Sequence, residues 1–114
     1  DMITIWHNPR CSKSRQALAL LEGRGEEVQV RRYLDDAPSI EELRLTRDTL
    51  GLRAIQMMRT GEAVFREQGL SKSDDDESLL EAMAATPKLI ERPVVFANGQ
   101  ARIGRPPEAV LEIL

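Results

Sequence analysis

The fold is decided by residues 6–15, which read Trp6-His7-Asn8-Pro9-Arg10-Cys11-Ser12-Lys13-Ser14-Arg15. An alternating apolar run precedes this stretch at Met2, Ile3 and Ile5, and it predicts a β-strand. Residues at helical spacing follow and predict one buried helix face: Ser14, Ala17, Leu18 and Leu21. Cys11 is therefore expected where a strand turns into the first turn of a helix.

Cys11 is the only cysteine, and its position predicts a reactive thiol. The free N–H groups and the positive dipole end of a helix favour a negative charge at its start, which lowers the pKa of a thiol placed there. Cationic residues flank it: Arg10, Lys13 and Arg15. The alternative is an inert, buried cysteine, which is common in proteins, but these polar and cationic neighbours favour a nucleophilic thiolate.

The composition limits the class of protein. The chain has 114 residues, of which 41% are hydrophobic and 31% charged, as expected of one globular domain over residues 1–114. No apolar run approaches the ~20 residues that span a bilayer, and no export leader is recognisable, so we expect a cytoplasmic protein without membrane contact.

The single cysteine excludes an internal disulfide and fits a reducing compartment. A net charge of −3 argues against nucleic-acid binding, and nothing demands more than a monomer.

The N-terminal part predicts a parallel pair of strands. The first helix is expected to end near Gly23, and alternating Val28 and Val30 predict a second strand that ends near Tyr33. Strand, helix and strand in so few residues form a βαβ unit with a right-handed crossover.

The C-terminal part predicts a hairpin and a final helix. Residues 93–97 and 100–103 flank Asn98-Gly99, a strong hairpin signal. Pro106-Pro107 then opens a helix, with these residues expected to face inward: Val110, Leu111 and Leu114. Together with the N-terminal unit, this order predicts an α/β fold with a mixed four-stranded sheet.

Between the second and third strands the sequence predicts a helical insertion over about residues 39–90. Ser39 and Glu42 form a capping box that opens its first helix, and Gly51 ends that helix. Short helices are expected around residues 53–59 and 62–68, the first with Ala54, Met57 and Met58 inward.

The acidic run Asp74-Asp75-Asp76-Glu77 opens the last helix of the insertion, which carries Leu79, Leu80 and Met83. Because the run lacks the spacing of a cation site, we expect a solvated helix start and no metal.

His7 and Ser14 are candidates for supporting the thiol. His7 is the only histidine, and it either steadies the thiolate from the turn or is simply a satisfied polar residue. With Cys11 alone it cannot complete a metal site. Ser14 stands where a Cys-x-x-Cys redox motif has its second cysteine, so Cys11 can form a covalent adduct that only an outside thiol can resolve.

Three arginines stand at the ends of predicted elements and are candidates for binding an anion: Arg59, Arg92 and Arg105. Any one of them alone is more simply a surface arginine. Arg92 is followed by Pro93, and a proline at a strand start beside a thiol site is often cis and directs backbone toward a ligand.

Four segments together carry a resemblance to a known family: residues 7–15 (His-Asn-Pro-Arg-Cys-Ser-Lys-Ser-Arg), 58–62 (Met-Arg-Thr-Gly-Glu), 91–95 (Glu-Arg-Pro-Val-Val) and 102–108 (Arg-Ile-Gly-Arg-Pro-Pro-Glu). In order and spacing they resemble the bacterial glutaredoxin-dependent arsenate reductase (ArsC) family over essentially the whole chain. The resemblance implies a thioredoxin-like, glutaredoxin-like fold with a helical insertion. The end at Leu114, and Gly104 where some members place a further cysteine, resemble the short ArsC-like proteins of the YfgD type.

The resemblance also implies a chemistry of arsenic detoxification. It assigns Cys11 as the nucleophile that attacks arsenate or a similar oxyanion, with His7 and Ser14 supporting the thiolate. It assigns oxyanion binding to Arg59, Arg92 and Arg105, and it makes Pro93 the cis-proline of the fold. Glutathione would be a co-substrate and glutaredoxin a partner, with no bound cofactor.

Two other functions stay open beside arsenate reduction. A monothiol glutaredoxin-like oxidoreductase would need Cys11 and a groove beside Pro93, but no arginine cluster. A non-enzymatic interaction protein like the Spx-type regulators would usually carry a Cys-x-x-Cys switch, which Ser14 removes here.

Overall fold

A computed structural model describes residues 2–114 and divides the chain into two compact units. One unit runs to Asp36 and resumes at Arg92 to include the C-terminus; the other is Ala37–Glu91. The second unit nearly coincides with the insertion predicted over residues 39–90. No helix within the described residues is both long and apolar enough to cross a bilayer.

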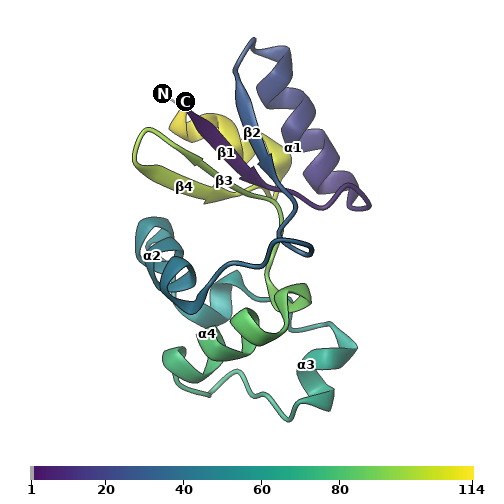
Figure 1. Cartoon of the computed structure of the whole chain (residues 1–114), viewed down its shortest axis with the longest axis vertical. Helices are drawn as coiled ribbons and strands as arrows, with labels where there is room; N and C mark the ends of the chain where they lie inside the picture. Colours follow the sequence, from purple (N-terminus) through teal and green to yellow (C-terminus); the bar gives the residue numbers. More distant parts are fainter. Residues whose placement is uncertain (1) are drawn as a thin grey trace. The chain divides into compact units, whose positions relative to one another are not determined.

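The first unit contains a mixed four-stranded sheet (Figure 1). Its strands are β1 (Ile3–Trp6), β2 (Val28–Arg31), β3 (Val94–Ala97) and β4 (Gln100–Ile103). They lie in the order β2-β1-β3-β4, with β1 parallel to β2 and antiparallel to β3, and β3 antiparallel to β4. This confirms the predicted α/β fold class, although β2 ends at Arg31 rather than near Tyr33.

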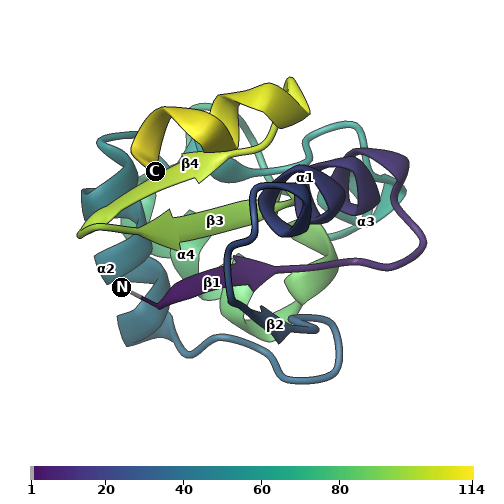
Figure 2. The same cartoon turned by 90° about the horizontal axis from the view of Figure 1, so that it is seen from above.

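Two helices cover one face of this sheet, as Figure 2 shows. They are α1 (Ser12–Gly23) and the 3₁₀ helix η3 (Pro107–Ile113), which contact each other. Alternate strand residues and the inner faces of both helices form the core: Ile3, Ile5, Ala17, Leu21, Val95, Ala97, Val110 and Ile113. Burying each of the larger aliphatic side chains contributes about 1.5–3 kcal/mol, so this core fixes the end of β1 against the start of α1.

The C-terminal helix differs from the prediction in its type and in the residues that it buries. Because a 3₁₀ helix has three residues per turn, residues three apart share a face, and η3 buries Pro107, Val110 and Ile113. Leu111 and Leu114, predicted to be inward, are only partly buried at the edge of the core.

The hairpin turn is confirmed at Asn98-Gly99, where both residues have positive φ angles of 54° and 73°. Such angles suit the tight turn between right-twisted strands. The Asn98 side chain also donates a hydrogen bond to the carbonyl of Ile113 at 2.8 Å, which fastens the end of the chain to the turn.

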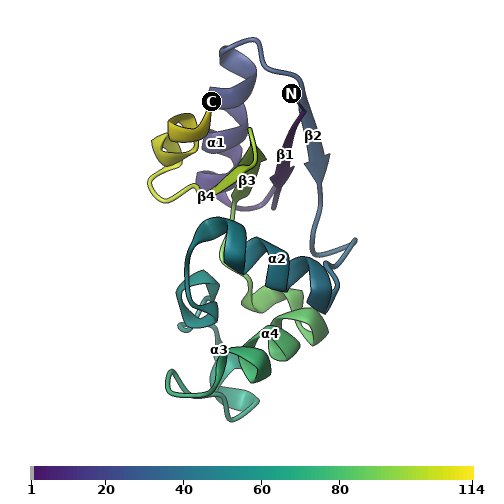
Figure 3. The ribbon, with the colours of Figure 1, turned by 90° about the vertical axis from the view of Figure 1, so that its left-hand side faces the viewer.

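The second unit is helical (Figure 3). Its elements are α2 (Ile40–Leu50), η1 (Ala54–Met57), α3 (Ala63–Glu67), α4 (Asp76–Ala85) and η2 (Pro87–Leu89). The capping box of Ser39 and Glu42 is confirmed, as is the end of α2 at Gly51, whose φ of 69° is the left-handed conformation typical of such ends. The predicted helix at 53–59 is shorter, because it ends at Met57 and Met58 forms an antiparallel bridge with Ile90.

The acidic run of the second unit is not merely solvated, as predicted, but binds neighbouring groups. Asp74 accepts from the Ser71 N–H at 2.9 Å and Asp75 caps α4 through the Ser78 N–H at 3.2 Å. The remaining two acids join α4 to earlier elements, through Asp76 with Arg47 and the Ala54 N–H, and Glu77 with Arg44. Local sequence could not reveal these partners, because they lie 22 to 33 residues away.

Candidate active site

Cys11 lies in a tight turn between β1 and α1, as its sequence position predicts. It is the N-cap residue of α1, with an extended backbone (φ −95°, ψ 123°). The carbonyl of Asn8 accepts the Cys11 N–H at 3.0 Å, and the Asn8 side-chain oxygen accepts the Arg10 N–H at 3.0 Å. Cys11 is 8% exposed, so the turn holds its side chain largely out of solvent while leaving the sulfur at a helix start.

Arg105 lies against the sulfur of Cys11. Its Nη2 atom is 3.8 Å from Sγ, and its Nε donates to the carbonyl of Arg92 at 3.0 Å. The peptide bond from Arg92 to Pro93 is cis, as is the bond from Arg105 to Pro106. Two of the three arginines singled out in the sequence are thus in contact with each other, and one of them, Arg105, lies against the thiol.

The pKa of the Cys11 thiol is lowered from its ordinary value by competing effects. Burial, the largest effect, raises this pKa, but the N–H of Ser14, the charge of Arg92, the N–H of Lys13 and the charge of Arg105 together outweigh it. The Cys11 side chain makes no regular capping hydrogen bond, but the N–H groups at the start of α1 and the Arg105 guanidinium, 3.8 Å from the sulfur, favour its negative charge. The result favours the thiolate, the form that acts as a nucleophile.

The cations that act on the thiol are not those predicted from its sequence neighbours. Arg10, Lys13 and Arg15 are exposed, and the Arg15 guanidinium donates to the carbonyl of Pro9 at 2.9 Å. The charges that lower the pKa of Cys11 are those of Arg92 and Arg105. Proximity along the chain was a poor guide, because these three side chains are exposed to solvent, whereas Arg105, from the end of another element, reaches the sulfur.

His7 and Ser14 form a buried pair next to the turn. His7 Nδ1 is 2.6 Å from Ser14 Oγ, which also accepts the Asn8 N–H at 3.0 Å. The pKa of His7 is lowered by burial and by the charges of Arg32 and Arg15, so its imidazole is neutral at neutral pH. Through Ser14, the histidine thus orders the backbone that carries the thiol, while the Ser14 N–H favours the thiolate.

Arg59, the third arginine, belongs to the second unit. Its Nη1 pairs with Glu62 Oε1 at 3.0 Å, and Lys88 Nζ lies 4.0 Å from the same oxygen. Its backbone N–H donates to the carbonyl of Leu89 at 2.8 Å, directly after the bridge between Met58 and Ile90. The carboxylate of Glu62 therefore fixes the guanidinium of Arg59 within this unit.

Sequence reasoning missed Asn8 and Gly104. Asn8 builds the turn through its carbonyl, its side chain and its N–H, and the signal was the Asn-Pro dipeptide, which is typical of turns. Gly104 directly precedes Arg105 and is buried beside the ring of Pro93. No local sequence signal reveals this role, because Pro93 lies at the start of a different strand.

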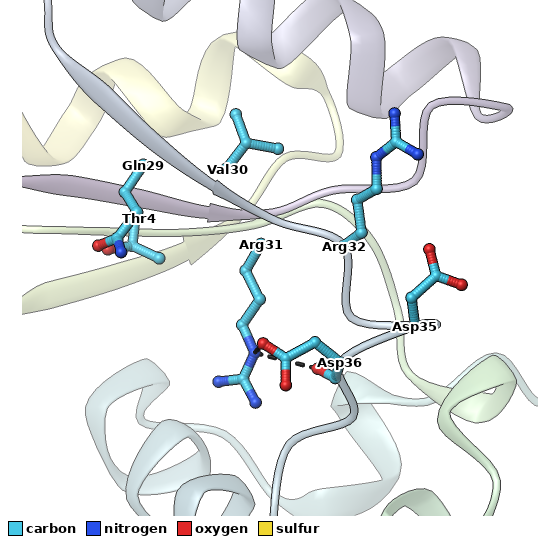
Figure 4. A pocket seen from close by; sticks show the side chains of 7 residues that line it. All are labelled: Thr4, Gln29, Val30, Arg31, Arg32, Asp35 and Asp36. Atoms are coloured by element: carbon cyan, nitrogen blue, oxygen red, sulfur yellow. Dashed lines mark hydrogen bonds and ion pairs between the residues drawn. The ribbon is translucent and has the colours of Figure 1, made fainter.

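A separate pocket of about 410 Å³ lies along β2, and none of the sequence-predicted site residues lines it (Figure 4). Within it, Arg31 pairs with Asp36 at 3.3 Å and stacks over Trp6, 5.6 Å from the ring centre. Its lining residues are Thr4, Gln29, Val30, Arg31, Arg32, Asp35 and Asp36.

A thiolate with one guanidinium 3.8 Å away, and with the charge of a second arginine lowering its pKa, can bind an oxyanion and attack it. The paired N–H donors of a guanidinium group match two oxygen atoms of such an anion. Its positive charge offsets the repulsion between a thiolate and a second negative group. Among residues 2–114, no three histidine, cysteine, aspartate or glutamate side chains are placed to hold a metal ion.

Comparison with known proteins identifies a family that the chain matches. The model of the ArsC family matches residues 6–113. A protein of Neisseria meningitidis serogroup A named arsenate reductase is 47% identical over 98% of this chain and 97% of its own length. Escherichia coli YfgD, named an uncharacterized protein, is 48% identical over 98% of this chain and 96% of its own length.

Solved structures agree with the sequence comparison. The structure of an arsenate reductase from Vibrio cholerae matches with a TM-score of 0.95 and 53% identity, covering 99% of this chain and 98% of that one. This likeness also confirms the thioredoxin-like fold with a mixed sheet. The chain belongs to the ArsC family.

Proposed function

We propose that this protein reduces arsenate to arsenite through an adduct on Cys11, with glutathione and glutaredoxin as the reducing thiols. The observation that carries the proposal is the Arg105 guanidinium 3.8 Å from the Cys11 sulfur. It is supported by the lowered pKa of that thiol and by relatives named arsenate reductase. The reaction needs no resident cofactor, and the reducing cytoplasm would supply glutathione.

In the first step, the Cys11 sulfur attacks arsenic. A sulfur–arsenic bond forms, an arsenic–oxygen bond breaks, and the oxygen leaves as water after taking up protons from solvent. Arsenic remains As(V). Arg92 and Arg105 would hold the anion and stabilise charge as the bonds change, and Arg59 would supply a third guanidinium, as the family motif implies.

The next steps need thiols from outside, since the chain has one cysteine. A glutathione thiol displaces a second oxygen from arsenic, again as water. A glutaredoxin thiolate then attacks the glutathione sulfur, and the electron pair of the broken sulfur–arsenic bond stays on arsenic, which becomes As(III). Glutathione leaves as a mixed disulfide with glutaredoxin, and water cleaves the remaining bond to release arsenite and the Cys11 thiolate.

His7 and Ser14 would act on the thiolate indirectly. A neutral His7 adds no positive charge to the site, so its role would be to hold the Ser14 hydroxyl. With that hydroxyl fixed between His7 and the Asn8 N–H, the start of α1 keeps the Ser14 N–H directed toward the sulfur.

The test is an assay with arsenate, glutathione and glutaredoxin, in which arsenite formation is followed directly. The wild type should turn over and Cys11→Ser should not, whereas Ser12→Ala, an exposed neighbour on the same turn, should keep the wild-type rate. Absence of arsenite from the wild type would overturn the proposal. If the wild type instead reduces glutathione mixed disulfides, and does so equally well in Arg105→Ala, the monothiol glutaredoxin-like function replaces it.

A further inference from the structure

Gly104 is the point of closest approach between the end of β4 and the segment that carries Arg92. A Cβ atom at this position would lie 2.7 Å from Cγ and 3.2 Å from Cδ of the Pro93 ring, and 3.2 Å from Val110 Cγ1. Pro93 and Val110 are both buried. A proline ring is tied to its own backbone and cannot swing aside, so a side chain at position 104 would push the strand end away.

Two hydrogen bonds join the same segments on either side of this contact. The Gly104 N–H donates to the carbonyl of Pro93 at 2.9 Å, and Arg105 Nε donates to the carbonyl of Arg92 at 3.0 Å. From this position, Nη2 of the same guanidinium lies 3.8 Å from the Cys11 sulfur. The placement of Arg105 at the thiol therefore depends on how closely residue 104 lies on Pro93.

We propose that Gly104 is a positioning residue of the active site: because it has no side chain, the end of β4 lies directly on the Pro93 ring, and this holds Arg105 against the sulfur of Cys11. The role of this placement in turnover rests on the proposed function, whereas its effect on the thiol does not, since the contact exists without substrate.

The test compares Gly104→Ala with Gly23→Ala, which adds the same methyl group in the same unit at a place with nothing within 4 Å. The rate of Cys11 alkylation by iodoacetamide is measured against pH. In Gly104→Ala the midpoint should move to higher pH, because Arg105 moves away from the thiolate, while Gly23→Ala should keep the wild-type midpoint. The kcat/KM for arsenate should fall about tenfold or more in Gly104→Ala alone.

A double-mutant cycle separates positioning from a general structural effect. In the Arg105→Ala background, Gly104→Ala should move the midpoint no further, because the guanidinium through which Gly104 acts is gone. An equal shift in both backgrounds, or an unchanged midpoint in Gly104→Ala, would overturn the inference. If Gly104→Ala does not fold, Gly104→Ala with Val110→Ala, which removes one of the contacted groups, takes its place with the same expected outcomes.

The result also distinguishes this inference from the proposed function. A shifted midpoint without any arsenate turnover by the wild type would leave the positioning role standing and reject the function. Arsenate turnover with an unshifted midpoint would do the reverse.

Discussion

Arginines pair with carboxylates in both units, as Arg31 and Arg102 do in the first, but the first unit also sets an arginine against a thiol. In the second unit, Arg44, Arg47 and Arg59 each contact a carboxylate, and the first two join helices that lie apart in sequence. In the first unit, Arg105 contacts a sulfur and a carbonyl oxygen, and together with Arg92 it lowers the pKa of the Cys11 thiol against the opposing effect of burial. Arginine side chains thus stabilise the fold where they pair with carboxylates, and favour a reactive thiolate where they act on a thiol.

The largest expected effect is that of Arg105→Ala. Removing this guanidinium should lower kcat/KM for arsenate by about 10²- to 10³-fold, as for other groups that stabilise charge in a transition state. It should also move the alkylation midpoint of Cys11 to higher pH. Arg102→Ala is the matched control, since Arg102 lies on β4, three residues before Arg105, but pairs with Glu112 at 3.1 Å. Equal losses in the two variants would contradict the comparison.

Arg59→Ala asks whether an arginine of the second unit also serves the chemistry. We expect the KM for arsenate to rise about tenfold through the loss of one charge-assisted contact to the anion. The alkylation midpoint should stay unchanged, since the charges that act on the pKa of the thiol are those of Arg92 and Arg105. Arg66→Ala, on the exposed side of α3, should leave KM unchanged. If the KM of Arg59→Ala for arsenate equals that of the wild type, Arg59 is not part of the proposed site.

Local sequence signals predicted those parts of the molecule that are set by local physics. The capping box at Ser39, the turn at Asn98-Gly99 and the helix start at Cys11 each depend on a few adjacent residues. Two of the failures involve partners far along the chain. Asp76 and Glu77 pair with arginines on α2, and Met58 forms a bridge with Ile90.

The candidate site shows the same division between local and distant contributions. Cys11, His7 and Ser14 lie in one segment, so a strand followed by a helix brings them together. Arg105 could be suggested as a candidate from its place at an element end, but its contact with the sulfur depends on a missing side chain at Gly104. Such a steric requirement has no periodicity and no local motif, so only the tertiary structure reveals it.

Between pH 5.5 and 9, two residues of the first unit, His7 and Cys11, should make the stability of the protein depend on pH. The pKa of His7 is lowered in the folded state, by burial above all, so the unfolded chain binds more protons as the pH falls below about 6.5 and stability is lost there. The pKa of Cys11 is also lowered, so its contribution is complete above about pH 8.5 and is lost as the pH falls through the folded-state value.

Urea unfolding at pH 5.5, 7 and 9 checks both ranges. His7→Asn should reduce the loss of unfolding free energy between pH 7 and 5.5 and leave the change between pH 7 and 9 as in the wild type. Cys11→Ser should do the opposite. If the free energy of unfolding of the wild type is higher at pH 5.5 than at pH 7, the assignment to His7 is contradicted.

The smallest effect is expected from Asp76→Ala, which breaks an ion pair that serves structure. Asp76 accepts from Arg47 at 3.4 Å and from the Ala54 N–H at 3.3 Å, and its side chain is 40% exposed. Because solvent screens such a pair, its loss should lower the free energy of unfolding by only about 0.5–1 kcal/mol. The alkylation midpoint of Cys11 and the KM for arsenate should both stay at their wild-type values. A shifted midpoint would mean that the charges of the second unit also act on the thiol, and the contrast between the arginines of the two units would then be one of degree, not of kind.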